Sequence, residues 1–255
     1  MKSRRIIIGD VHGHYDGLMN LIEAIAPTDL DQIYFLGDLI DRGPKSSQVV
    51  TFVKNSHYRC LMGNHEEMML KAMPNGKVDQ AAWQAWLYSG GKETIESYRD
   101  TGVMPYEDLE WMSKLPSYFD LGDVWLVHAG VNPEKPINKQ TNREFCWIRK
   151  EFHQIKKPFF QDKLIITGHT ITFTFNGVQP GELVQGQGWL DIDTSAYHHL
   201  SGWLTGLDID NRLAHQANVF TEEVRVLPLD ELIKPYQSRN DEKQNILSRI
   251  FAANN

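Results

Sequence analysis

Short apolar runs that end abruptly at a glycine and a polar residue constrain the fold of this chain more than any other feature. Five such runs occur, at residues 5–8, 33–36, 58–62, 125–127 and 164–167. Their length and their β-branched content predict buried strands. Apolar residues at helical spacing separate the early runs, first at Leu18, Leu21, Ile22 and Ile25 and then at Val49, Val50 and Val53. Strands that alternate with helices indicate a layered α/β fold.

Polar side chains stand just beyond the end of each run, where α/β folds bind their ligands. They are Asp10, His12, Asp38, Asn64, His128 and His169. This mixture of carboxylate, amide and imidazole donors suits manganese, iron or zinc better than calcium or a structural zinc ion. Six donors exceed the needs of one tetrahedral ion and match two ions that share a carboxylate. Each residue alone could be a helix cap or a turn residue, but six coincidences beside glycines argue against that interpretation.

Three blocks of the sequence make the interpretation more specific. They are Gly9-Asp10-Val11-His12-Gly13, Gly37-Asp38-Leu39-Ile40-Asp41-Arg42-Gly43 and Gly63-Asn64-His65-Glu66, followed later by His128-Ala129-Gly130 and Gly168-His169. In this order the blocks resemble the signature motifs of the PPP-family metallophosphoesterases, especially the bacterial and phage Ser/Thr protein phosphatases. The resemblance implies an α/β fold of two mixed β-sheets packed together and flanked by helices, with a small helical insertion.

The resemblance also implies roles for the motif residues. Asp10 and His12 would hold a first divalent ion, Asp38 would bridge, and Asn64, His128 and His169 would hold the second. Manganese is the expected metal, with iron or zinc as alternatives. Two such ions can activate a bridging hydroxide for direct attack on phosphorus and neutralise the phosphoryl oxygens, so no phosphoenzyme is needed.

The leaving oxygen needs a proton, and His65 is the candidate general acid because it directly follows Asn64. By the same resemblance Asp41 would orient His65, although a salt bridge between Asp41 and Arg42 is an alternative. Arg42 and a second arginine would bind phosphate together with Asn64. The Trp-x-Arg context favours Arg149 for the second arginine, and Arg143 is its rival.

The sequence predicts a phosphorylated protein or a small phosphoester as substrate, and it favours the protein-phosphatase branch, with Ser/Thr specificity first and Tyr as an alternative. The reason is the segment 86–91, a tryptophan followed by a Gly-Gly helix break, which resembles the insertion of the protein-phosphatase branch. The alternative is a symmetrical dinucleoside-polyphosphate hydrolase, such as one acting on diadenosine tetraphosphate. A catalytically silent scaffold of the same fold is disfavoured, because no ligand is missing. Neither Cys60 nor Cys146 precedes an arginine at the spacing that cysteine phosphatases need.

A late segment, Asp193-Thr194-Ser195, resembles the family's Asp-Thr-Gly turn. We expect Asp193 to support the metal loop. Serine in place of glycine puts the conformation of the turn in question. His198 and His199 follow it, either at the mouth of the site or on the surface.

The chain reads as one domain over residues 1–235, with a helical insertion at about 75–118 and a tail at 236–255 that is either an amphipathic helix or loose. Residues 188–227 predict an antiparallel meander that completes a second sheet. The net charge of −7 argues against nucleic-acid or membrane partners. Two cysteines and the lack of a signal-peptide core lead us to expect a reduced, cytoplasmic protein of undetermined oligomeric state.

Overall fold

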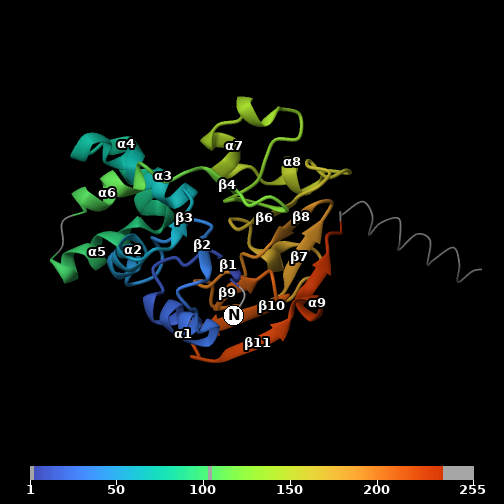
Figure 1. Ribbon diagram of the computed structural model, residues 1–255. Helices are drawn as coiled ribbons and strands as arrows, with labels where there is room; N and C mark the ends of the chain where they lie inside the picture. The colour runs from blue at the N-terminus through green and yellow to red at the C-terminus, as the bar shows by residue number, and fades with distance from the viewer. Residues whose placement is uncertain (1–2, 103–104, 238–255) are drawn as a thin grey trace, which may run out of the picture.

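Two six-stranded sheets form the centre of the protein in the computed structural model, which describes residues 3–102 and 105–237 (Figure 1). In spatial order the first sheet contains β11 (Val224–Pro228), β10 (Leu213–Asn218), β9 (Trp203–Asp208), β1 (Arg5–Ile8), β2 (Gln32–Phe35) and β3 (Arg59–Cys60). The second contains β12 (Ile233–Pro235), β7 (Leu183–Gly186), β8 (Trp189–Asp191), β6 (Leu164–Thr167), β5 (Val124–Val127) and β4 (Tyr118–Asp120). Both sheets mix parallel and antiparallel pairs, which confirms the expected fold class.

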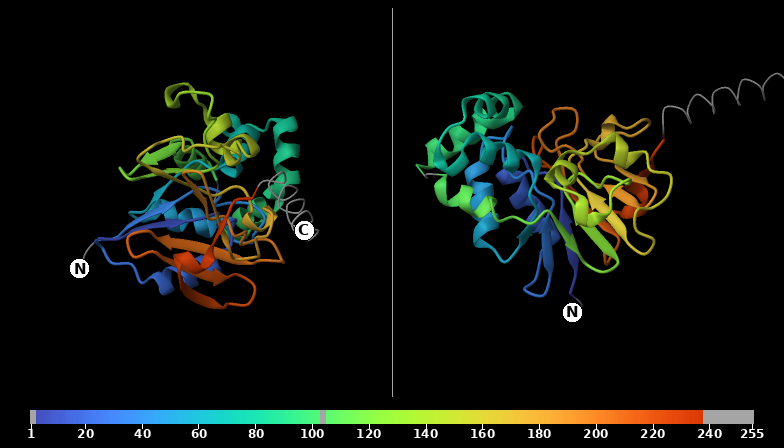
Figure 2. Two further views of the ribbon diagram at one scale, coloured as in Figure 1. Left: turned by 90° about the vertical axis from the view of Figure 1, so that its right-hand side faces the viewer. Right: turned by 90° about the horizontal axis from the view of Figure 1, so that it is seen from above.

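Helices cover both outer faces of this pair of sheets. They are α1 (Tyr15–Ile25), α2 (Ser46–Asn55), α3 (Asn64–Ala72), α4 (Gln80–Trp86), α5 (Lys92–Thr101), α6 (Tyr106–Met112), α7 (Asn142–Trp147), α8 (Lys150–His153) and α9 (Leu229–Leu232). Short 3₁₀ turns occur at Pro74–Gly76, Ile137–Lys139 and Thr172–Thr174, and a π-helical turn at Leu87–Gly91. The view from above in Figure 2 separates the group containing α4, α5 and α6 from the yellow and orange strands of the second sheet.

Alternation along β1 shows how the layers are held together. Ile6 and Ile8 are fully buried in an apolar cluster with α1 and α2, whereas Ile7 is buried in a second cluster with residues of the other sheet, such as Leu126 and Ile166. A strand buried on both faces reads as a continuous apolar run, which explains why the sequence shows no polar alternation there. A third cluster packs the second sheet against α7 and α8.

The five predicted strands are present, although β3 covers only two residues of the run that predicted it. The expected C-terminal meander was wrong in its placement. β9, β10 and β11 extend the first sheet, where Ile7 of β1 lies opposite Leu207 of β9. Only β8, from the start of that region, joins the second sheet. Local sequence predicts that a segment is extended, but its neighbour is chosen by long-range packing.

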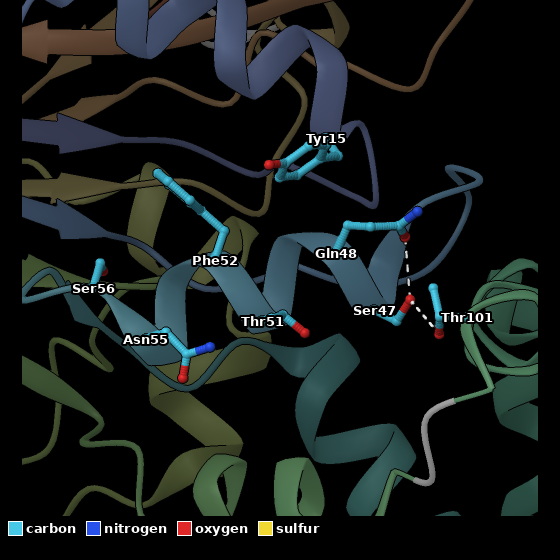
Figure 3. Close-up of a pocket in the computed structure, with 8 residues that line it drawn as sticks. All are labelled: Tyr15, Ser47, Gln48, Thr51, Phe52, Asn55, Ser56 and Thr101. Carbon is cyan, nitrogen blue, oxygen red and sulfur yellow. Dashed lines mark hydrogen bonds between the residues drawn. The ribbon is translucent and has the colours of Figure 1, made fainter.

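The expected helical insertion is present as α4, the π-helical turn, α5 and α6, and it is fastened to α2. Ser47 of α2 shares hydrogen bonds with Ser97 (2.8 Å) and Thr101 (3.3 Å) of α5. Figure 3 shows the Ser47–Thr101 contact beside a cavity that also borders Tyr15 of α1 and Phe52 of α2. The residue limits of the domain stay a prediction. Nearly all of the predicted tail, from residue 238 on, lies outside the described residues.

Both cysteines are free and buried, Cys60 in the cluster beneath α1 and α2 and Cys146 in the cluster beneath α7. Burial raises the pKa of each thiol above its usual range. Among the described residues no helix combines the length and apolar character needed to cross a membrane.

Candidate metal centre

Five strand ends deliver the six predicted ligands to one edge of the paired sheets. Asp10 and His12 follow β1, Asp38 follows β2, Asn64 begins α3 after β3, and His128 and His169 follow β5 and β6. All six are buried. His12, Asp38 and His169 have positive φ angles of 47°, 48° and 69°. Such backbone conformations are costly for residues other than glycine and concentrate at functional sites.

Asp38 lies at the middle of the cluster and faces a histidine group on each side. Its Oδ2 atom is 3.7 Å from His12 Nε2 and 3.9 Å from His65 Nε2, and its Oδ1 atom is 3.4 Å from His128 Nε2. Two groups of potential ligands therefore share this carboxylate, one with His12 and His65 and the other with His128 and His169. One carboxylate common to two donor groups is the arrangement expected for a pair of ions.

Backbone carbonyls and Asn64 orient the imidazoles of the second group and of His12. His12 Nδ1 lies 2.9 Å from the carbonyl oxygen of Ile40, and His128 Nδ1 lies 2.9 Å from that of Leu36. In each case the Nε2 atom is left to face the cluster. Asn64 Oδ1 lies 2.9 Å from His128 Nε2 and 2.7 Å from His169 Nδ1, so three donor atoms meet there. The carbonyl contacts of His12 and His128 are of the kind that fix the tautomer and direction of metal-binding histidines.

Asp10 shows that the donor set fits cations. Its Oδ2 atom accepts a hydrogen bond from the His169 backbone N–H (3.0 Å), whereas its Oδ1 atom is buried without a partner among the described residues. Burial, followed by the charges of Asp193 and Asp38, raises the pKa of Asp10 well above its usual range. Burial lowers the pKa of His12 and His169, which leaves these imidazoles neutral. Neutral imidazoles among mutually repelling carboxylates suit divalent manganese, iron or zinc.

His65 belongs to this centre through Asp41. His65 Nδ1 lies 2.6 Å from Asp41 Oδ2, and both residues are buried. Trp86 Nε1 donates to both oxygens of Asp41 (3.0 and 2.9 Å), and the Thr94 hydroxyl donates to Oδ1 (2.6 Å). Asp41 is therefore held by His65, Trp86 and Thr94, and the alternative of an Asp41–Arg42 salt bridge is not observed.

The Gly-Gly break supports the same loop. The Arg42 N–H donates to the carbonyl of Gly90 (3.0 Å), and Asp41 and Arg42 both have positive φ angles, 73° and 69°. Gly90 has a φ of 111°, and a Cβ there would lie 2.7 Å from Arg42 Cγ. A Cβ on Gly91 would lie 2.6 Å from the Trp86 ring. The π-helical turn thus depends on glycine in order to pack against the loop that carries Asp41 and Arg42.

The arginines separate into two places. Arg42 Nη1 lies 2.9 Å from His12 Nε2, and its guanidinium lies 4.0 Å from the centre of the Tyr197 ring. Arg149 Nη1 donates to the carbonyl of His169 (3.0 Å) and to Thr170 Oγ1 (3.1 Å). Arg143 instead lines a hollow with Trp147 and contacts none of the ligands. This geometry favours Arg149 over Arg143 as the second arginine of the site.

The late turn is also close to the centre. Asp193 is buried, and its Oδ1 atom accepts a hydrogen bond from the Ser195 backbone N–H (2.9 Å). Ser195 has a φ of 61°, so serine adopts the left-handed conformation that the family's glycine would take. His198 and His199 stack on each other (4.6 Å between ring centres), and His198 packs against Phe173 rather than against a ligand.

The sequence model of the calcineurin-like phosphoesterase family matches residues 3–191, the part of the chain that carries every ligand described above. The chain belongs to this family. A relative from Dechloromonas aromatica (strain RCB), named symmetrical bis(5'-nucleosyl)-tetraphosphatase, is 31% identical over 131 residues, which are 50% of this chain and 44% of the relative. The chain spans about half the length of the curated relatives it matches.

Solved structures agree with this family's fold. A crystal structure provisionally named diadenosine tetraphosphatase covers 89% of this chain and 94% of its own, with a TM-score of 0.59 and 20% identity. The cold-active protein-tyrosine phosphatase of a psychrophilic Shewanella covers 89% of this chain and 81% of its own, with a TM-score of 0.58 and 18% identity. At these identities the likeness concerns the fold alone.

Three residues of this calcineurin-like site escaped the sequence analysis. Trp86 was interpreted only as a mark of the protein-phosphatase branch, and Thr94 lies in the predicted insertion without an assigned role. Glu66 was noted only as part of a motif, yet it accepts hydrogen bonds from the backbone N–H groups of Asp38 (2.9 Å), Leu39 (2.8 Å) and Gly63 (3.0 Å). Burial, followed by the charge of Asp38, raises the pKa of Glu66 to about 7. Its position two residues after Asn64, in the first turn of a helix, was the available signal.

Asp10→Asn tests whether the cluster is built for cations. The substitution removes a buried charge that Asp193 and Asp38 repel, while an oxygen remains for the His169 N–H. We expect the metal-free variant to melt several degrees above the wild type. Manganese should raise the melting temperature of the wild type but raise that of the variant much less. Asp16→Asn, at an exposed carboxylate, is the control. A variant that gains as much from manganese as the wild type would contradict the assignment.

Trp86→Phe tests the support of Asp41. The variant keeps a buried ring but removes the N–H that donates to Asp41, so we expect the free energy of unfolding in urea to fall by about 1–3 kcal/mol. Trp83→Phe, one turn earlier on α4, is the matched control and should cost less, because no hydrogen bond to a buried carboxylate is lost. Equal losses for the two variants would show that only ring packing matters.

Proposed function

We propose that this chain is a two-metal phosphohydrolase that cleaves dinucleoside polyphosphates symmetrically. The observation that carries the chemistry is Asp38, which is shared by two donor groups with Arg42 and Arg149 beside them. The choice of substrate is supported by the curated relatives, which are named symmetrical bis(5'-nucleosyl)-tetraphosphatases. A silent scaffold of the same fold is disfavoured. Burying several carboxyl groups close together costs free energy, and a protein that bound no cations would gain nothing in return.

Asp10, His12 and Asp38 would hold one divalent cation, and Asp38, Asn64, His128 and His169 the other. When bound, such a pair supplies a nucleophile from water and neutralises charge on the phosphoryl oxygens. Arg42 and Arg149 are suited to bind those oxygens, since a guanidinium offers planar, permanently charged donors. His65 turns Nδ1 toward Asp41 and Nε2 toward the centre, which suits it to donate a proton from Nε2 to the oxygen that leaves phosphorus.

The phosphoprotein substrate expected from the sequence is the second candidate. Its main support was the tryptophan followed by Gly-Gly. In the structure Trp86 bonds to Asp41, and Gly90 bonds to the backbone of Arg42. The segment therefore serves a loop that either substrate would need, and it does not distinguish between them. The physical reason for preferring a protein substrate is thereby lost.

Substrate class is tested by one comparison in the presence of manganese. We expect kcat/KM on diadenosine tetraphosphate to exceed that on phosphoserine and phosphotyrosine peptides at least tenfold, with ADP as the sole nucleotide product. Chelation of metal should abolish all three activities. Preference for a phosphopeptide, or release of ATP and AMP from the dinucleotide, would contradict the proposed specificity. Full turnover in metal-free protein would contradict the chemistry itself.

His65→Asn tests the proton donor. A leaving oxygen of low basicity needs little protonation, so the effect should depend on the leaving group. We expect kcat to fall about 100-fold or more on an alkyl phosphate and much less on p-nitrophenyl phosphate, with manganese affinity retained. His57→Asn, at a histidine outside the centre, is the control. Equal losses on both substrates would argue that His65 supports the site without transferring a proton.

A further inference from the structure

Trp147 is a large aromatic side chain left partly on the surface beside the centre. It ends α7, its side chain is 38% exposed, and its ring meets that of His169 edge to face, with 6.4 Å between ring centres. Its indole N–H donates to a carboxylate oxygen of Glu67 on α3. The ring is therefore held in one orientation although water reaches it. Tryptophan side chains with one apolar and one polar end are enriched at binding interfaces.

A hollow of about 380 Å³ adjoins this ring. Its walls include Trp147, Ile148, Asn132, Lys135 and Arg143. Lys135 is neutralised by an ion pair with Glu144. The guanidinium of Arg143, by contrast, has no hydrogen-bond or ion-pair partner among residues 3–102 and 105–237. The hollow, which Glu151 also lines, thus offers an apolar ring and the available cationic group of Arg143 beside one carboxylate.

Trp147 connects the hollow with the predicted metal centre, because it lines the first and contacts a residue of the second. Arg149 contacts the backbone of the ligand His169, at the position proposed for phosphate. Trp147 contacts the ring of His169 and lines the hollow together with Arg143. Because Trp147 contacts His169, a group attached to a phosphate bound at the centre would lie within reach of the Trp147 ring. A nucleobase there could stack on the indole, and such stacking stabilises any of the bases because each has an aromatic face.

We propose that the hollow beside Trp147 binds the nucleoside of one arm of the substrate, with the base stacked on Trp147 and its polar edge near Arg143. This assignment rests on the proposed dinucleotide specificity for its biological meaning. Stacking area decides the strength of such a contact, so purine nucleotides bind more tightly than pyrimidine nucleotides. Phosphate chemistry at the metal centre does not require the hollow, which makes the two parts separable by experiment.

The test compares two inhibitors of p-nitrophenyl phosphate hydrolysis in the manganese-loaded protein. ADP and methyl diphosphate carry the same phosphates and differ by the nucleoside. We expect the inhibition constant of ADP to be about tenfold lower for the wild type, and the two constants to become nearly equal in Trp147→Ala. Trp147→Phe should retain much of the preference. Tyr106→Ala, which removes an exposed aromatic ring elsewhere, should retain all of it.

The outcomes separate this inference from the proposed function. If diadenosine tetraphosphate is hydrolysed but ADP and methyl diphosphate inhibit equally, or Trp147→Ala keeps the preference for ADP, the nucleoside site is wrong and the activity stands. If the dinucleotide is not hydrolysed yet ADP is preferred and Trp147→Ala removes the preference, the nucleoside site stands and the proposed substrate is wrong.

Discussion

The burial of several carboxyl groups close together is the constraint on which the rest of this structure depends. Asp10, Asp38, Asp191 and Asp193 all lie inside the protein where the strands of the two sheets end. Burial and the neighbouring Asp193 raise the pKa of Asp191, whose Oδ2 atom lies 3.5 Å from His153 Nε2 and has no hydrogen-bond partner among the described residues. Such a group of carboxylates persists because apolar clusters on both faces of each sheet fix the strands that carry them. The fold therefore keeps these carboxyl groups close together, and bound cations would offset the repulsion between their charged forms.

Much of this arrangement was readable from the sequence. β1 and β6 coincide with the runs that predicted them, because a strand buried on both faces leaves a continuous apolar signal. The predicted ligands were readable for a related reason, since each lies within four residues of the end of a strand and within two residues of a glycine. The choice of which distant strands pair with each other could not be predicted, because it is not encoded in the local sequence. Nothing between residues 203 and 228 indicates that these strands belong next to β1 rather than in the other sheet.

The support of the loop that carries Asp41 and Arg42 was hidden for the same reason. Trp86 and Thr94 lie 45 and 53 residues from Asp41 in sequence, yet both bond to its carboxylate. Read along the chain, Trp86 marks an amphipathic helix and the following glycines mark a break. Only because the insertion packs against α2 and α3 do Trp86 and Thr94 reach the Asp41 carboxylate and hold it by hydrogen bonds. The same segment therefore suggested a preference for protein substrates, although its contacts are internal.

The two thiols offer a way to observe motion in this architecture. Cys60 and Cys146 occupy the apolar layers on opposite outer sides of the paired sheets, and burial keeps both largely protonated. A thiolate-selective alkylating reagent can reach either sulfur only when the covering layer opens. The rate of Cys60 modification would then report on local opening of the layer formed by α1 and α2. The rate of Cys146 modification would report on local opening of the layer formed by α7 and α8. The chain carries, without engineering, one internal reporter for each half of its fold.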